Sequence, residues 1–236
     1  MTAPHARRRA PTPGDPPALF HSHLILTATE QQASHDIRRL QQLLAGGLPA
    51  LGRERAPAGG RMLFAAVRAP AVPGSDTAIA PAGPALAMVV RTGVRPDWSP
   101  LLDAGRLAAA EVRPVTPAPA AGQEVSLRIT ANPVIRDRRT HRHSPLRSRS
   151  ECQAWLRRSL ARHGVRVTGP VHVSPATRLT GTGRNGPVVL VIRDFQARAT
   201  VTDSAALAGA LAEGIGRGKA YGCGMLNLTP SAPRSW

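Results

Sequence analysis

The chain has 236 residues and a formal net charge of +17, from 31 Lys and Arg against 14 Asp and Glu. With 42% hydrophobic residues it can bury a core, two cysteines are too few for a disulfide framework, and no apolar run reaches the roughly 18 residues of a membrane span. We therefore expect a cytoplasmic protein without membrane contact and with an anionic partner, most commonly nucleic acid.

The N-terminal segment, residues 1–17, contains five prolines and three consecutive arginines, a composition typical of a disordered basic tail. After it, the partial alternation of Phe20–Leu26 predicts a strand. Ser34 or Asp36 is suited to cap a following helix, which Gly46 and Gly47 would end. The apolar residues of this helix have helical spacing and are Ile37, Leu40, Leu43 and Leu44.

The rest of the first half continues with alternating strands and helices. The apolar runs Met62–Val67 and Leu86–Arg91 predict two paired strands. A helix is expected over Ser99–Ala109 and a strand over Glu111–Val115. Residues 18–115 therefore have the pattern βαββαβ.

Residues 116–123 have the composition of a linker, and the same pattern then begins again. The predicted elements are a strand over Glu124–Ala131, a helix opened by Ser150 and Glu151 and closed by Gly164, strands over Val165–Val173 and Pro187–Val201, a helix capped by Asp203 or Ser204, and a strand over Met225–Leu228. Residues 124–230 are again βαββαβ, and 231–236 form a tail. Two such units predict an α+β fold of two tandem ferredoxin-like domains.

A strongly basic segment lies at the start of the second unit. Residues 128–166 hold eleven arginines against two acids, and this density would let several guanidinium groups reach the phosphates of one nucleic acid. The alternative is a solvated, flexible loop. The arginines that we expect to contact nucleic acid are Arg128, Arg136, Arg138, Arg139, Arg142, Arg147, Arg149, Arg157 and Arg158.

A second candidate site is the glycine-rich stretch Gly214–Gly224, which follows a predicted helix and precedes a strand. Backbone without side chains can approach a phosphate closely, although such a loop is also commonly a tight turn. The spacing is not that of a P-loop, because Ala220 follows the lysine. The residues expected to contact nucleic acid here are Gly216, Arg217, Gly218, Lys219 and Gly222.

The sequence indicates neither a metal nor a cofactor. His21 and His23 share one strand face without a third ligand, and there is no HExxH, CxxC or Asp cluster. We expect Cys152 and Cys223 to be buried as small apolar residues.

Two motifs resemble signatures of the CasE family, the CRISPR repeat-processing endoribonucleases of the type I-E Cascade complex. One is the C-terminal run from Gly214 to Pro230, and the other is Arg128-Ile-Thr-Ala-Asn-Pro133 after the middle strand. The helix around Trp155 is also similar. The resemblance covers about residues 19–230.

The resemblance implies a duplicated ferredoxin-like fold and a metal-independent endoribonuclease. Such a protein binds the stem-loop of a CRISPR repeat transcript and cuts at the 3′ base of the stem. The 2′-hydroxyl attacks the scissile phosphate, which leaves a 2′,3′-cyclic phosphate and a 5′-hydroxyl. The enzyme then stays on the cut RNA with the other Cascade subunits.

The family's catalytic positions differ in this sequence. The family has a histidine on the first helix as general acid or base and a tyrosine three residues earlier, where this chain has Gln41 and Arg38. Glutamine cannot transfer protons at neutral pH, whereas Arg38 could stabilise charge on the phosphorane. Either a shifted alignment of this helix or His35, six residues before Gln41, as a substitute would restore the proton-transferring group.

Three hypotheses stay open at this point. The chain is a metal-independent endoribonuclease that uses His35, Arg38 and Gln41, or it is a Cascade subunit that holds the RNA with weak or no cleavage. A generic basic RNA-binding protein would explain the charge but not the C-terminal motif.

Overall fold

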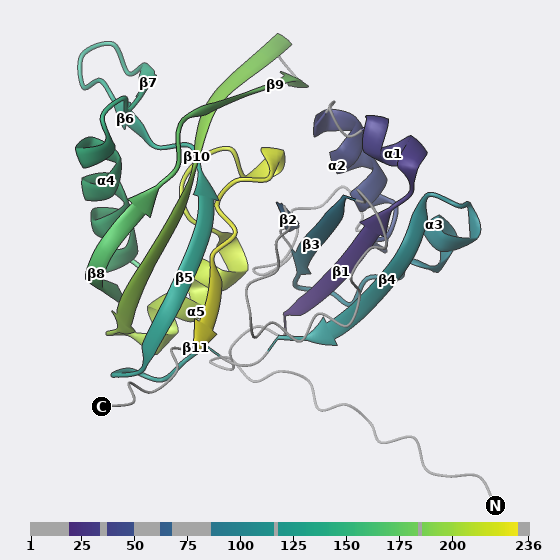
Figure 1. The fold of residues 1–236 in the computed structure, drawn as a ribbon, viewed down its shortest axis with the longest axis horizontal. Helices are drawn as coiled ribbons and strands as arrows, with labels where there is room; N and C mark the ends of the chain where they lie inside the picture. Colours follow the sequence, from purple (N-terminus) through teal and green to yellow (C-terminus); the bar gives the residue numbers. More distant parts are fainter. Residues whose placement is uncertain are drawn as a thin grey trace, which may run out of the picture.

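The computed structural model describes residues 19–33, 37–49, 62–67, 86–115, 118–183 and 186–230. Two larger antiparallel sheets stand side by side, with the C-terminal sheet at the left of Figure 1 and the N-terminal sheet at the right. The glycine-rich segment, drawn in yellow, reaches from the C-terminal sheet toward the N-terminal one. Within the described ranges, no helix is long and apolar enough to cross a membrane.

The N-terminal sheet has the strand order β2-β3-β1-β4, and all its neighbouring strands are antiparallel. Its elements are β1 (Phe20–Leu26), α1 (Ala28–Ala33), α2 (Ile37–Ala45), β2 (Leu63–Val67), β3 (Ala87–Thr92), α3 (Ser99–Asp103) and β4 (Leu107–Pro114). Leu40, Leu43 and Leu44 of α2 are buried in one cluster with Leu24 and Val90. The helix expected from their spacing and the expected strand pair β2–β3 are confirmed.

The second helix of this half is shorter than expected. The prediction of a helix over Ser99–Ala109 is wrong beyond Asp103, and the expected strand at Glu111 begins at Leu107 instead. Gly105 turns the chain with a φ of +63°, and Leu107 then pairs with Leu26 of β1. Residues 107–110 are leucine and alanine, which favour helix in isolation, but pairing with a neighbouring strand overrides that preference.

The C-terminal sheet has the order β11-β5-β10-β8. Its main elements are β5 (Glu124–Ala131), α4 (Arg149–Ala161), β8 (Val165–Val173), β10 (Gly186–Val201), α5 (Ser204–Glu213) and β11 (Asn227–Pro230). Alternate residues of β5 are buried with Leu156 of α4 and Leu207 of α5, so both helices cover one face of the sheet. When the four strands are numbered within each half, both sheets have the order fourth, first, third, second.

The C-terminal half contains three strands that the sequence did not indicate, two in the basic loop and one before β10. β6 (Val134–Arg136) and β7 (His143–Pro145) form a hairpin between β5 and α4, and β9 (Thr177–Gly183) pairs with the first half of β10. The helix α4 begins just before the expected residues, because Ser148 and Glu151 form a capping box. The last strand starts two residues later than expected, since Met225 and Leu226 are buried before it.

Candidate nucleic-acid interface

The segment 214–226, called the glycine loop below, connects α5 to β11 and is closed at its base. The amide of Ile215 donates to the Gly224 carbonyl at 2.8 Å, and the Gly224 amide donates to the Thr130 carbonyl of β5 at 2.7 Å. Gly224 has a φ of +84°, and a Cβ there would lie 2.4 Å from the Ile215 carbonyl oxygen. Only glycine fits this position, so the base of the loop is sterically defined.

The tip of the glycine loop lies against the N-terminal half. It contains a 3-10 turn, η1 (Lys219–Tyr221), which contacts α2 and β2. Tyr221 packs on the N-terminal core, and a Cβ on Gly222 would lie 3.0 Å from Cε2 of Phe64. The structure therefore brings the glycine loop next to α2, the helix that carries two candidate catalytic residues.

On α2, Arg38 is exposed and Gln41 is half-buried. Gln41 lies one turn after Ile37, so it borders the buried stripe of the helix. His35 and the expected caps Ser34 and Asp36 lie outside the described residues. The polar side chains in the described part of the helix are thus guanidinium groups and amides, and neither kind transfers protons near neutral pH.

The glycine loop contacts the β6–β7 hairpin through a side chain and the segment just before the hairpin through the backbone. Arg217 Nη1 and His143 Nε2 are 3.0 Å apart, and Arg217 forms a β-bridge with Asn132. Arginine can only donate, so His143 accepts with a neutral ring. Desolvation, with Arg217 and Arg136 nearby, lowers the pKa of His143, which favours that neutral form.

The turn of this hairpin is held by Asp137, which accepts from the amides of Arg139 at 2.9 Å and Thr140 at 2.7 Å. The arginines around it are exposed and belong to one segment of the chain, residues 136–149. The expected residues on or beside the hairpin are Arg136, Arg138, Arg139, Arg142, Arg147 and Arg149. This arrangement presents several phosphate-binding groups next to the glycine loop.

Three other expected arginines lie elsewhere. Arg157 and Arg158 are on α4, and Arg157 Nη2 donates to the Gly169 carbonyl of β8 at 2.9 Å. The residue of α4 that meets the glycine loop is Trp155, about 200° around the helix from Arg157. Arg128 is exposed on the sheet face opposite α4 and α5. The structure does not bring these three to the hairpin.

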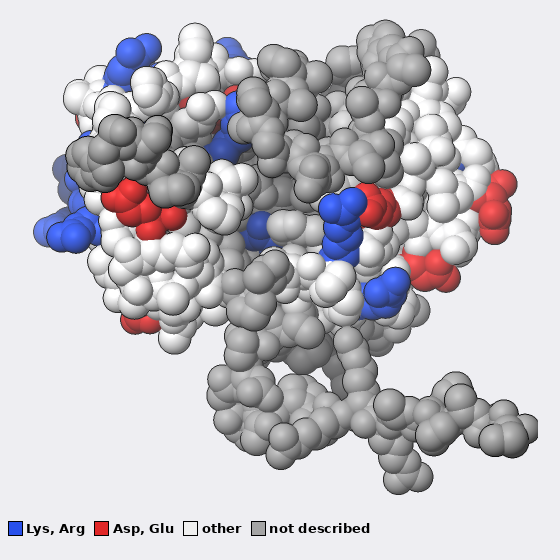
Figure 2. All heavy atoms as spheres, turned by 60° about the horizontal axis from the view of Figure 1, so that its bottom comes forward, with Lys and Arg blue, Asp and Glu red and all other residues white. Residues whose placement is uncertain are grey.

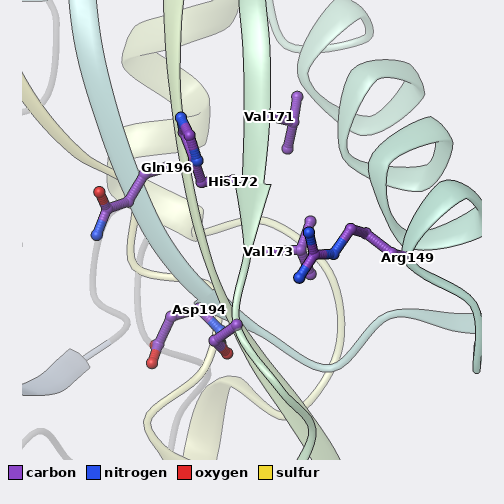
Figure 3. A pocket seen from close by; sticks show the side chains of 7 residues that line it. Arg149, Val171, His172, Val173, Asp194 and Gln196 are labelled. Atoms are coloured by element: carbon purple, nitrogen blue, oxygen red, sulfur yellow. Dashed lines mark hydrogen bonds between the residues drawn. The ribbon is translucent and has the colours of Figure 1, made fainter.

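The charged groups are unevenly distributed over the surface. On the face drawn in Figure 2, a group of Lys and Arg lies at the left edge, on the half of the molecule that contains α4 and β8, and further groups lie near the centre and to the right of it. A depression beside the end of β8 is lined by Arg149, His172, Asp194 and Gln196 among others. Figure 3 shows these side chains around it. Arg149 thus extends the basic surface from the hairpin toward β8.

Burial and turn geometry account for the two cysteines and for two glycines of the glycine loop. Cys152 and Cys223 are buried, as expected, and burial raises the pKa of Cys223 to about 12. The described ranges contain no group of three His, Cys, Asp or Glu side chains that could hold a metal ion. Gly218 and Gly222 have positive φ and flank η1, so the turn itself accounts for both glycines.

The sequence alone did not identify two residues that make contacts in this region. His143 had no neighbour in the chain that marked it, because its partner is 74 positions away. Arg91 of β3 donates to the Leu211 and Leu226 carbonyls at the two ends of the glycine loop. Its one signal in the sequence was that it is a lone arginine in an apolar strand, where charged residues are rarely buried without partners.

Comparison with known proteins places the chain in a class. A family model described as CRISPR associated protein matches residues 19–230. The CRISPR-associated endoribonuclease Cse3 of Thermus thermophilus is 32% identical over 154 residues, which cover 61% of this chain and 72% of that protein. The Cascade subunit CasE of Escherichia coli K12 is 34% identical over 87 residues, which cover 36% of this chain and 42% of that protein.

Solved structures agree with this class. Cse3 bound to a 19-nucleotide RNA has a TM-score of 0.75 at 24% identity, covering 90% of this chain and 100% of that one. Thermus thermophilus Cse3 with an RNA representing a pre-cleavage complex has a TM-score of 0.73 at 25% identity with the same coverage. The fold is thus that of CRISPR-associated RNA endonucleases. The chain belongs to the CRISPR-associated family that contains Cse3 and CasE, as the resemblance implied.

Proposed function

We propose that this chain binds the stem-loop of a CRISPR repeat transcript, cleaves the precursor RNA at the base of the stem without a metal ion, and stays bound as a Cascade subunit. The family membership and the names of its relatives support the RNA substrate and the Cascade partners. The observation that carries the proposal is the contact of the glycine loop with α2 on one side and with the β6–β7 hairpin on the other.

The proposal includes two tandem ferredoxin-like domains, 18–115 and 124–230, joined by 116–123. The equal strand order of the two sheets and their separate core clusters support this division. The RNA stem would lie on the second domain, at the hairpin. An RNA duplex is read mainly through its backbone and shape, which suits exposed guanidinium groups and a chain with few aromatic residues.

The cleavage chemistry would take place beside α2. Arg38 supplies a positive charge that can stabilise the phosphorane formed when a 2′-hydroxyl attacks the adjacent phosphorus. A group that moves protons is needed as well, and His35 is the candidate in this segment. Without such a group the rate falls by roughly 10²–10⁴-fold.

A second candidate function is an RNA-holding Cascade subunit with little or no cleavage. Gln41 favours it, because this residue stands where the family has its proton-transferring histidine. Both functions use the same basic hairpin and glycine loop, so they differ only in the fate of the bound RNA.

One experiment tests the proposal and separates the two functions. The protein is incubated with its own repeat RNA in EDTA, and the products are resolved. A single cut with a cyclic phosphate end, lost in His35→Ala, supports the enzyme and its proton-transferring residue. RNA that is bound tightly but left intact supports the holding subunit, and RNA that is neither bound nor cut contradicts both.

A further inference from the structure

Arg91 of β3 is buried at the junction between the two sheets. Its side chain is 2% exposed and donates four hydrogen bonds, none of them to a carboxylate. Nη1 lies 3.1 Å from the Leu211 carbonyl, and Nη2 lies 2.9 Å from the Leu226 carbonyl and 3.5 Å from Asn227 Oδ1. Nε donates to His21 Nε2 at 2.6 Å.

The two carbonyls belong to the two stems of the glycine loop. Leu211 is in the last turn of α5, just before the loop begins, and Leu226 is its final residue. One guanidinium therefore spans the entry and the exit of the loop. Its own strand is inside the N-terminal sheet, between β1 and β2, so the contact joins the loop to a fixed element of the other half.

The partners explain why a cation is stable at this place. A carbonyl in the last turn of a helix has no partner within the helix, and the C-terminal end of the helix carries partial negative charge. Arg91 donates to this carbonyl and places its positive charge at this end of α5. Burial lowers the pKa of Arg91 to about 10, so the side chain still carries its charge at neutral pH.

Neighbours of Arg91 make further contacts at the same junction. Leu63 pairs with Arg91 across the sheet, and a Cβ on Gly214 would lie 2.9 Å from Cδ2 of Leu63. The first glycine of the loop thus packs directly against β2. The loop is positioned by contacts at its stems as well as at its tip.

We propose that Arg91 is a positioning residue that clamps both stems of the glycine loop and so fixes the loop relative to α2. This role rests on the proposed function for its effect on RNA, but not for its effect on the loop. Without Arg91 the loop would open locally while the two sheets stay folded, and the residues at its tip would lose their register with α2.

The chain provides a specific probe of this opening, because Lys219 is its only lysine. A lysine-specific endoprotease can cut only after this residue, inside the glycine loop. The test variant is Arg91→Met, which keeps most of the side-chain volume and adds no new polar group, but leaves the Leu211 and Leu226 carbonyls without their donor. Arg91→Lys is unsuitable because it would add a second cleavage site.

In Arg91→Met we expect the cut after Lys219 to be at least about tenfold faster than in the wild type, with a urea dependence much shallower than that of global unfolding. The matched control is Arg106→Gln, which removes the ion pair with Glu30 in the N-terminal half and leaves the loop untouched. The control should be cut at the wild-type rate in the absence of urea. A rate in Arg91→Met that equals the wild type, or that rises only in step with global unfolding, would overturn the proposal.

A second measurement uses the wild type alone and decides the question if Arg91→Met does not fold. The amides of Ile215 and Gly224 close the loop base, and the clamp requires that they exchange hydrogen less than about 100-fold faster than amides of β3. Exchange about 100-fold faster than that of β3 would mean that the loop moves freely despite Arg91.

The RNA measurement separates this inference from the proposed function. Arg91→Met should bind the repeat stem-loop at least about tenfold more weakly than Arg106→Gln does. If the wild type binds no repeat RNA, the proposed function fails, while the protease result still decides the role of Arg91. If the wild type binds and Arg91→Met binds equally well with an intact loop, only the clamp fails.

Discussion

Gln41 is the residue on which the choice between cleavage and holding depends. It borders the buried stripe of α2 on the helix that meets the glycine loop, at the position where the resemblance to the CasE family implies a histidine. If proton transfer is missing at this position, Gln41→His should raise the single-turnover cleavage rate by about 10²-fold or more. The matched control is Gln42→His, since Gln42 is exposed one residue further along the same helix.

The pair of variants gives a clear reading. An equal rate increase in Gln41→His and Gln42→His would show that position 41 has no special access to the RNA. No increase in Gln41→His, together with loss of cleavage in His35→Ala, would place the proton-transferring group at His35 instead.

His21 makes folding depend on pH. Burial, and then the charge of Arg91, lower the pKa of His21 from 6.5 to about 3. A pKa lowered by folding stabilises the protein fully above the unfolded value, and this contribution is lost as the pH falls from 6.5 toward 3. The loss should approach about 1.4 kcal/mol per pH unit.

His21→Gln tests this dependence, because glutamine can still accept from Arg91 but does not titrate. Urea unfolding of both proteins between pH 7 and pH 4 should give a flatter curve of unfolding free energy for the variant. Carboxylates titrate equally in both proteins, so parallel curves would contradict the assignment to His21.

At the scale of elements, we predict that the β6–β7 hairpin binds the RNA stem. Each lost phosphate contact reduces the slope of log affinity against log salt by about 0.9. Removing two exposed charges with Arg138→Gln and Arg139→Gln should therefore weaken binding and flatten the slope by roughly one to two. Titrations of the repeat stem-loop at several salt concentrations measure this change.

A comparison variant removes the same charge from α4. Arg157→Gln with Arg158→Gln should change the slope less, because Arg157 already donates to the Gly169 carbonyl and lies away from the glycine loop. Equal slope changes in the two double variants would contradict the placement of the stem at the hairpin.

The base of the glycine loop should tolerate no side chain. Gly224→Ala combines a positive φ with a Cβ 2.4 Å from a carbonyl oxygen, so it should lower the unfolding free energy by roughly 3 kcal/mol or more. Gly105→Ala has a positive φ of +63° but open space around its Cβ, and should cost only about 1 kcal/mol. If urea unfolding shows similar losses of unfolding free energy in the two variants, the steric contact at the loop base contributes nothing to the cost of Gly224→Ala.

For the molecule as a whole, the sequence predicted which segments form helices and strands better than it predicted which of these elements contact one another. Leu40, Leu43 and Leu44 revealed α2, and the alternation of Val125, Leu127 and Ile129 revealed β5, because burial on one face leaves a period in the sequence. The α+β class and the order of the main elements followed from these patterns. The end of α3 did not, since it depends on the pairing of Leu107 with another strand.

The site was predicted in parts rather than as an assembly. Composition marked the basic segment, and the terminal motif marked the glycine loop. The contacts that join them, Arg217 with His143 and Arg91 with Leu211 and Leu226, link residues 70 or more positions apart. The pattern of residues along one sequence does not show such partners, because contacts between distant residues produce no repeat in the sequence around them.

The proposed function requires that a defined surface recognises an RNA stem, rather than that a net charge of +17 attracts any polyanion. The most direct test is the affinity for the chain's own repeat stem-loop, measured at one salt concentration against an RNA of the same composition that cannot form the stem. We expect the stem-loop to bind at least about 100-fold more tightly. Equal affinity for the two RNAs would contradict it and leave only a generic basic protein.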